Sequence, residues 1–328
     1  MAPTSRFAVL FAGLVGCTHA PGEARAEPVP AARVAESAMV SSAAPVTAAP
    51  QHVVTPEASA APTTAFSPPW TPPYAAEGTV ASRIAPPKGF HRVPAAPGTF
   101  AAFLRALPLA PPGTPVKSYA GSEILAADDS RLAAVLNLDI GAGDLQQCAD
   151  SIERMHAEWR WSVGRSDVTY PAASGTALGF NEWKKGVRWA PKGMGLERST
   201  GAKPDDSYGS YRRYLAFVFA WSNTVALERL GAGAGADSSK VRIEKSELRG
   251  GDFFVMGGNP GHAVLIVDVV EDDQHHRRAL IGQGYMPAQN FHLVRPEGSD
   301  SPWFSLDGDA VATPFWKPFP MTSARRME

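Results

Sequence analysis

The sequence predicts an α+β protein in which a few helices pack on a small antiparallel sheet. The first observation is order: two long helical patterns precede a group of apolar, strand-like runs in the C-terminal part of the chain, as in α+β proteins. The second is a polar turn between two of these runs, which indicates an antiparallel hairpin. The third is an abrupt change of composition near Ile84, before which the chain offers little material for a core.

Composition and charge exclude several classes of protein. The 328 residues include 31 Lys and Arg against 32 Asp and Glu, for a net charge of -1, whereas proteins that bind nucleic acids usually carry a strongly basic face. Two cysteines are too few for a disulfide framework or a four-ligand zinc site. We therefore expect no nucleic-acid partner, no metal and no cofactor. The sequence specifies no oligomeric state.

The N-terminus has the pattern of a lipoprotein signal peptide over residues 1–16. Arg6 precedes an apolar stretch of about ten residues, which is too short to span a membrane. The stretch ends in Leu-Val-Gly-Cys, which resembles the bacterial lipobox. This resemblance implies cleavage before Cys17 and lipidation of that residue, and Thr18 in the next position favours the outer membrane. We expect an exported, lipid-anchored protein of the cell envelope that does not cross the membrane.

Residues 17–83 are expected to form a disordered tether rich in Ala and Pro. Between residues 18 and 70 about 15 residues are Ala and about 9 are Pro, and none is Leu or Ile. Such a segment cannot bury enough apolar surface to offset the entropy lost on folding, and its prolines keep it extended. The segment 68–74 is either the end of the tether or the first part to touch the domain. Residues 84–328 are expected to form a single α+β domain.

The first half of the domain contains a short helix, two strands and a longer helix. We expect the short helix over residues 99–107 and the strands over 116–119 and 133–140. In the longer helix Asp144 suits the N-cap, and Gln147 completes a capping box. The apolar face of that helix carries Leu145, Cys148, Ile152, Met155 and Trp159. On another face, ion pairs are expected among Asp150, Arg154 and Glu158, which lie four residues apart.

The second half of the domain alternates loops, one helix and several strands. Residues 160–207 are loop-rich and aromatic, and a second long helix is expected over 211–230, where a run of glycines ends it. A strand over 252–256 and a glycine-rich turn follow. A buried strand over 262–270 then leads through the polar turn into a returning strand over 278–283.

Three residues form a candidate catalytic set. Cys148 lies in the first turn of a helix, where exposed N–H groups and the helix dipole favour a thiolate. His262 begins the buried strand, and a cysteine nucleophile needs such a base together with a third group that orients it. With the hairpin centred on the polar turn, His262 lies opposite Met286. Gln283 and Gln289 are each about three residues from that position. Gln283 is preferred because it ends a regular strand, and Gln289 is the alternate.

The order of these features resembles the NlpC-type branch of the papain-like cysteine peptidases. The chain has a cysteine at a helix start, then GGDFFV, then GHAVLIVDV, then a polar residue on the next strand. A closer resemblance is to domain of unknown function 4846, a family of bacterial exported proteins and lipoproteins. It is carried by the segments LQQCAD, FFVMGGNPGHAVLIVDV, GQGYMPAQ, SPWFSL and TPFW. This family implies export and a lipid anchor, but no established activity.

The preferred interpretation is a cysteine-dependent amide hydrolase or acyl transferase, with Cys148 as nucleophile, His262 as base and Gln283 as orienting partner. Location and fold analogy point to the peptide part of peptidoglycan as substrate. The choice of oxyanion donor is open between Gln146 and the backbone N–H of Cys148. One alternative is a non-catalytic envelope module that binds glycan or a partner protein through aromatic loop residues, and another is an inactive descendant of a peptidase. The aromatic residues in question are Trp161, Trp183, Trp189, Trp303 and Trp316.

Overall fold

The computed structural model describes residues 68–71, 74–230 and 242–327, all within one compact unit. The expected signal peptide, Cys17 and most of the expected tether lie outside the described residues. Ordered structure begins before Ile84, because η1 (Ala76–Gly78) and α1 (Val80–Arg83) precede it. Trp70 packs against the core. Within the part of the chain that the structure describes, residues 68–71 are therefore the first to contact the domain.

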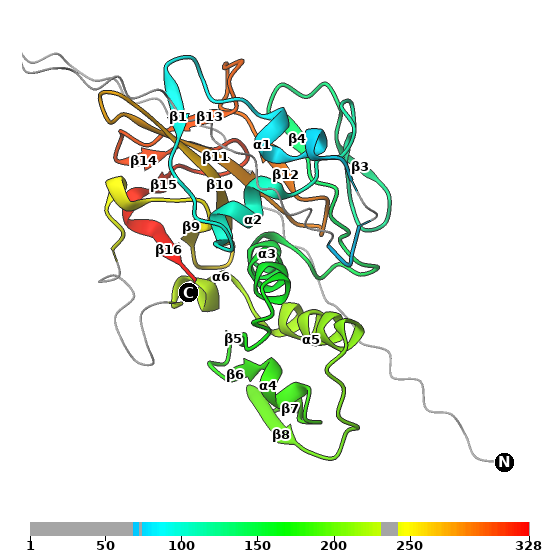
Figure 1. Ribbon diagram of the computed structural model, residues 1–328. Helices are drawn as coiled ribbons and strands as arrows, with labels where there is room; N and C mark the ends of the chain where they lie inside the picture. Colours follow the sequence, from blue (N-terminus) through cyan, green and yellow to red (C-terminus); the bar gives the residue numbers. More distant parts are fainter. Residues whose placement is uncertain (1–67, 72–73, 231–241, 328) are drawn as a thin grey trace, which may run out of the picture. The chain divides into compact units, whose positions relative to one another are not determined.

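An eight-stranded antiparallel sheet forms the centre of the domain (Figure 1), and it is larger than the small sheet expected. Its main path runs β16-β9-β10-β11-β12-β4, with β1 added to β10 and β13 added to β11. The strands are β1 (Phe90–Arg92), β4 (Leu132–Val135), β9 (Asp252–Met256), β10 (His262–Asp272), β11 (Arg277–Gln283), β12 (His292–Val294), β13 (Trp303–Ser305) and β16 (Ala324–Arg326). Helices that pack against an antiparallel sheet confirm the α+β class, although β1 and β4 precede the two long helices.

Strand β10 lies in the middle of the sheet and is buried on both faces. Successive side chains of a strand point to opposite faces, so Leu265 and Val267 enter one apolar core while Val264 and Ile266 enter the other. The sheet is therefore covered on both sides. The polar residue at the start of the strand, His262, is drawn into the interior and is only 2% exposed.

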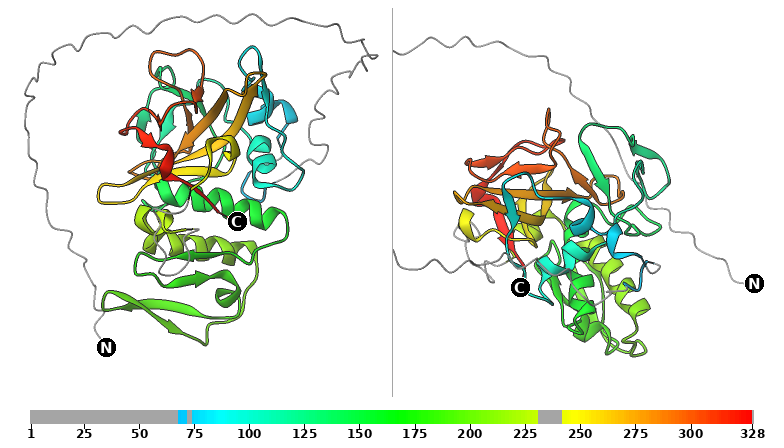
Figure 2. Two further views of the ribbon diagram at one scale, coloured as in Figure 1. Left: turned by 90° about the vertical axis from the view of Figure 1, so that its left-hand side faces the viewer. Right: turned by 45° about the horizontal axis from the view of Figure 1, so that its top comes forward.

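The two long helices form successive layers on one side of the sheet. In the left view of Figure 2, α3 (Cys148–Ser162) lies beneath the sheet and α5 (Tyr208–Trp221) lies on the far side of α3. The remaining helical segments are α2 (Phe100–Ala106), α4 (Phe180–Trp183), α6 (Thr224–Glu228), η3 (Lys245–Glu247) and η4 (Met321–Ser323). Helix α2 agrees with the short helix expected over 99–107. No helix in the described part of the chain has the length and apolar character needed to cross a membrane.

Helix α3 begins three residues later than expected. Gln147 is its N-cap residue, and the backbone N–H of Gln147 donates to Asp150 Oδ2 at 3.0 Å. The expected N-cap at Asp144 is wrong, because this side chain instead accepts from the Gln147 amide at 3.0 Å and from the backbone N–H of Ala288 at 2.6 Å. Cys148 is consequently the first helical residue, and its N–H has no acceptor within the helix.

Three other expectations for the helices and strands need correction. The region 160–207 contains two hairpins and α4 rather than mostly loops. The expected helix over 211–230 is interrupted, because Ser222 and Asn223 are extended and Asn223 caps α6, and such residues compete with the helix by bonding to the backbone. The expected strand over 133–140 is shorter, since β4 ends at Val135. The small two-stranded ribbons are β2 (Val116–Lys117) with β3 (Glu123–Leu125), β5 (Thr169–Pro171) with β6 (Ala177–Gly179), β7 (Arg188–Lys192) with β8 (Gly195–Ser199), and β14 (Ala310–Val311) with β15 (Phe319–Pro320).

The hairpin of β10 and β11 has the expected centre but an irregular middle. Asp268 pairs with Leu280, as a hairpin centred on the polar turn requires, and the register then shifts by one residue. Such a bulge bends and twists the strand that carries it. The expected pairing of His262 with Met286 is not formed: His262 pairs with Met256 of β9, and Met286 is 67% exposed.

Candidate active site

The structure brings the three candidate catalytic residues together from α3, β10 and β11. His262 Nε2 and Gln283 Oε1 are 2.8 Å apart, and because an amide oxygen only accepts, the imidazole N–H donates to it. The backbone N–H of Ala263, the residue after His262, lies close enough to the Cys148 thiol to favour its thiolate. The start of α3 and the start of β10 therefore meet at the sulfur.

Two glycines allow this close approach. A Cβ on Gly284, which follows Gln283, would lie 2.2 Å from Ser151 Oγ and 2.8 Å from the carbonyl oxygen of Gln147, both at the start of α3. Gly261 fits as tightly, because its Cβ would lie 2.2 Å from Thr224 Oγ1. Real Cβ atoms do not approach other atoms so closely. Any other residue at position 284 would move the end of β11 away from α3, and any other residue at position 261 would move the start of β10 away from α6.

Aromatic rings surround the imidazole of His262 and exclude water from it. The ring centroids of Tyr285, Trp316 and Phe319 lie 4.7, 5.2 and 6.0 Å from that of His262. Burial lowers the pKa of His262 to about 4, although the hydrogen bond to Gln283 opposes this change. His262 is therefore neutral at neutral pH, which is the state that a general base requires.

The thiol of Cys148 is neutral as well, contrary to the expectation of a thiolate. Burial raises its pKa to about 11 and the Asp150 carboxyl adds to the rise, whereas the backbone N–H groups of Ala149, Ala263 and Cys148 itself oppose it. Desolvation outweighs the favourable N–H groups at the helix start. Cys148 as a whole residue is nevertheless half-buried rather than fully buried.

Two further carboxyl groups are buried in the first turns of α3. Asp150 and Glu153 are 6% and 0% exposed, and burial raises the pKa of Asp150 to about 8 and that of Glu153 well above its usual value. Ser222 Oγ donates to Glu153 Oε1 at 2.7 Å. One oxygen of each carboxyl has no partner among the described residues. Both groups are protonated at neutral pH, so Asp150 then exerts little repulsion on a forming thiolate.

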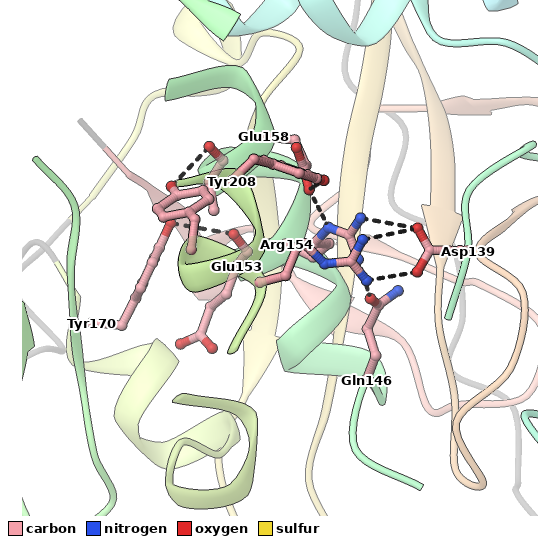
Figure 3. Close-up of polar contacts among 10 residues, drawn as sticks. Asp139, Gln146, Glu153, Arg154, Glu158, Tyr170 and Tyr208 are labelled. Carbon is pink, nitrogen blue, oxygen red and sulfur yellow. Dashed lines mark hydrogen bonds and ion pairs between the residues drawn. The ribbon is translucent and has the colours of Figure 1, made fainter. Parts of the chain in front are cut away.

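A fully buried arginine on α3 fixes the side chain of Gln146 (Figure 3). Arg154 donates through Nη1 to Gln146 Oε1 at 3.1 Å, through Nε to Glu158 Oε1 at 2.6 Å and through Nη2 to Asp139 Oδ2 at 3.2 Å. Gln146 Nε2 is buried and has no partner in the part of the chain that the structure describes. Gln146 thus has a fixed orientation and an unused donor, two residues before Cys148.

The same network tests the ion pairs expected on α3. The pair of Arg154 with Glu158 is confirmed. The pair of Arg154 with Asp150 is not formed, because the Asp150 carboxyl turns back to the N-cap while Arg154 reaches Asp139. Helix α5 covers this polar face: Tyr208 of α5 donates to Glu158 Oε1 at 2.7 Å.

The structure also places one residue that the sequence analysis missed. His292 of β12 lies opposite Gln283 of β11, and its Nε2 is 3.3 Å from Gln283 Nε2. Its Nδ1 lies 3.0 Å from the carbonyl oxygen of Asn290. A polar residue inside the apolar run 291–294 was the available signal. The alternate Gln289 forms an isolated bridge with Ser118 instead.

Among the described residues, the cavity, the possible metal ligands and the tryptophans give no second candidate site that includes the three catalytic candidates. A cavity of about 840 Å³ is lined by the C-terminal part of α3, with Trp159, Arg160, Arg249 and Arg326 among its residues and none of the candidates. Within residues 68–71, 74–230 and 242–327, no three His, Cys, Asp or Glu side chains are grouped as metal ligands. The loop tryptophans do not form an exposed row: Trp183, Trp189 and Trp303 are buried, and Trp161 and Trp316 are partly buried.

Comparison with known proteins gives one match. A family model described as domain of unknown function (4846) matches residues 80–326, a range that contains Cys148, His262 and Gln283. No curated protein and no solved structure matches the chain. The match covers most of the described domain and assigns no activity.

Proposed function

The chain belongs to the family described as domain of unknown function (4846), and we propose that it is a cysteine-dependent amide hydrolase or acyl transferase with a papain-like, NlpC-type site. One observation carries the proposal. The thiol of the half-buried residue Cys148 lies beside the backbone N–H that follows His262, and His262 is held by a hydrogen bond to Gln283. A nucleophile, a neutral base and an orienting group are the three parts that such catalysis requires.

The neutral state of the pair determines how the first step proceeds. The sulfur of Cys148 attacks the carbonyl carbon of the substrate amide as its proton passes to the ring nitrogen of His262 that faces away from Gln283. The C–N bond then breaks, and the departing amine takes that proton from His262, which leaves a thioester on Cys148. Water, or an acceptor amine in a transferase, attacks the thioester with His262 again as base. The acyl group departs and the thiol regains its proton.

Two groups are suited to stabilise the oxyanion of the tetrahedral intermediate. The backbone N–H of Cys148 is the first of α3 and has no acceptor within the helix. The side-chain amide of Gln146 is buried, oriented by Arg154 and unpaired at Nε2. Donors fixed in this way before the reaction begins need no reorganisation when charge develops.

The proposed setting is the bacterial cell envelope. The signal-peptide pattern over residues 1–16 and the lipobox cysteine, Cys17, support export and a lipid anchor, and the tether allows the domain to reach cell-wall peptide. Labelling with radioactive palmitate in the producing bacterium tests the anchor. Cys17→Ser should abolish incorporation and Cys148→Ser should preserve it, whereas labelling that survives Cys17→Ser contradicts the anchor.

The binding-module alternative has lost its main support. Stacking on glycan rings requires exposed aromatic faces, and the tryptophans considered for that role pack inward. A module of this kind would also tolerate the loss of the thiol. The remaining alternative, an inactive descendant of a peptidase, keeps the same geometry and differs only in reactivity.

Incubation with purified peptidoglycan tests the proposed activity. Full-length protein carrying Cys17→Ser should release soluble peptides or free amines, and mass spectrometry should detect an acyl adduct that hydroxylamine removes. Cys148→Ala should abolish both signals. Release that is unchanged in Cys148→Ala, or the absence of both release and adduct with intact protein, contradicts the proposed function.

A further inference from the structure

The row of polar groups behind His262 continues one residue beyond Gln283. His262, Gln283 and His292 are 2%, 1% and 0% exposed, and they form a line across β10, β11 and β12. Consecutive separations are 2.8 Å from His262 Nε2 to Gln283 Oε1, 3.3 Å from Gln283 Nε2 to His292 Nε2, and 3.0 Å from His292 Nδ1 to the carbonyl oxygen of Asn290. Water has no access to this line, so each group must satisfy the next.

The far end of the line determines the position of every proton in it. A backbone carbonyl only accepts hydrogen bonds, so Nδ1 of His292 must carry the proton that bonds to Asn290. Burial lowers the pKa of His292 to about 4, while the backbone hydrogen bond to Asn290 and the charge of Asp129 oppose this change. His292 is therefore neutral at neutral pH, and its Nε2 is a bare acceptor.

The acceptor on His292 selects one of the two orientations of the Gln283 amide. With NH₂ toward His292, the amide donates to Nε2; with the oxygen there, two lone pairs would face each other. The oxygen of Gln283 must then point to His262, which requires a proton on His262 Nε2. His262 Nδ1, the ring nitrogen nearer the main chain, is left with its lone pair free. The Cys148 thiol lies near the backbone N–H of the next residue, Ala263, and Nδ1 is the ring nitrogen that remains available to it.

We propose that His292 is a positioning residue that sets the tautomer of His262, through Gln283, so that Nδ1 is the atom that accepts the thiol proton. The proposal rests on the proposed function, because it assigns a role within that reaction. His292 touches neither the thiol nor a substrate and acts only by orienting an amide. Gln283 has no means of fixing its own orientation, since both ends of an amide can bond to an imidazole nitrogen.

The tautomers of the unmodified histidines provide a test that needs no substitution at the site. In ¹⁵N-labelled full-length protein with Cys17→Ser, long-range ¹H–¹⁵N spectra at pH 7 distinguish protonated from bare ring nitrogens. We expect His292 to carry its proton on Nδ1 and His262 on Nε2. A proton on His262 Nδ1, or on His292 Nε2, overturns the proposal whether or not the protein proves to be an enzyme.

Two substitutions at position 292 separate positioning from packing. His292→Phe keeps a ring of similar size but offers no acceptor, whereas His292→Gln can place an amide oxygen near the former position of Nε2. We expect His292→Phe to give both tautomers of His262 and to slow iodoacetamide alkylation of Cys148 at pH 7 in proportion to the population of the wrong tautomer, about twofold when the two are equal, because the wrong tautomer has no base at the thiol. His292→Gln should keep the parent tautomer and the parent alkylation rate.

The controls separate failure of the inference from failure of the proposed function. Thermal unfolding of both variants monitors the fold. If His292 has only a structural role, alkylation should slow only in a variant whose melting temperature falls, and it should slow equally in His292→Phe and His292→Gln. A stable His292→Phe protein with parent tautomers and parent alkylation overturns the positioning role. Expected tautomers together with a Cys148 that never reacts would instead support the positioning role and contradict the enzyme.

Discussion

The reactivity of Cys148 should be independent of pH over several units, and His262 should be the reason. A thiol whose pKa is raised to about 11 is ionised at pH 7 to about 10⁻⁴, against roughly 3% for a free cysteine with a pKa of about 8.5. If Cys148 reacted only through its own ionisation, alkylation at pH 7 would be about 300-fold slower than that of free cysteine. The rate would also rise about tenfold per pH unit up to the thiol pKa.

Proton transfer to His262 changes both the rate and its pH dependence. The reactive state is then a neutral thiol beside a neutral imidazole, which exists at every pH above the His262 pKa of about 4. The alkylation rate should form a plateau from about pH 5.5 to about pH 9 and fall only below it. His262→Ala removes the acceptor of the proton, so the plateau should be replaced by the steep, log-linear rise of an isolated thiol.

The assay is the pseudo-first-order rate of iodoacetamide alkylation between pH 4.5 and 10, followed by mass spectrometry on full-length protein with Cys17→Ser. His275→Ala is the matched control, because this histidine lies in the exposed turn after β10 and its side chain pairs with the nearby Glu271. It should leave the plateau intact. A log-linear profile in the parent protein, or identical plateaus in the parent and His262→Ala proteins, would refute the reasoning.

Three further predictions concern the scaffold that holds the site. Gly284→Ala should lower the free energy of unfolding in urea by about 1–3 kcal/mol because of overpacking, whereas Gly143→Ala, whose new Cβ meets nothing closer than 3.8 Å, should change it by less than about 0.5 kcal/mol; equal losses would contradict the close approach. Burial raises the pKa of Asp150 to about 8 in the folded protein. The stability that this protonated carboxyl contributes is therefore complete below its unfolded pKa of about 4 and is lost as the pH rises toward 8. Asp150→Asn, which cannot ionise, should therefore gain about 5–10 °C in melting temperature over the parent between pH 5 and pH 8.5, and parallel melting curves would show that another group titrates. Arg154→Met should cost about 3–5 kcal/mol, since it leaves buried acceptors unpaired. Arg213→Ala, in an ion pair with a side chain 62% exposed, should cost under about 1 kcal/mol, and a similar loss for both would mean that the buried network contributes little.

The sequence was informative wherever a local pattern determined the structure. The apolar run of β10 and the polar turn after it gave the hairpin centre, and Gly, His and Gln in that stretch led to the contact of His262 with Gln283. Residue spacing did not reveal the bulge between Ile266 and Asp268, because a bulge changes the register without changing the pattern of burial. The shift is what allows the contact, because in the expected register Gln283 lies three residues from the position opposite His262 and so on the other face of the sheet, whereas in the observed register it lies two residues away and on the same face.

The sequence was least informative where an element is covered on two sides. Helix α3 shows one apolar stripe, which is typical of a surface helix with its polar side in water. The structure adds α5 over that polar side, and the side chains of Glu153, Arg154 and Glu158 become fully buried. No pattern within α3 signals this second layer, because burial of its polar groups depends on partners that come from segments far away in the chain, such as Tyr208.

The same burial explains how the proposed catalytic pair, a neutral thiol and a neutral imidazole, can be held in position. A thiolate and an imidazolium attract each other, but a neutral thiol and a neutral imidazole have almost no electrostatic attraction to hold them together. Their placement must then come from the scaffold. Arg154 ties the segment before Cys148 to the body of α3, Gly284 lets the end of β11 touch the first turn of that helix, and Gln283 fixes the ring of His262. A buried pair in which both partners are neutral thus depends more on the surrounding residues for its position than a thiolate–imidazolium pair would.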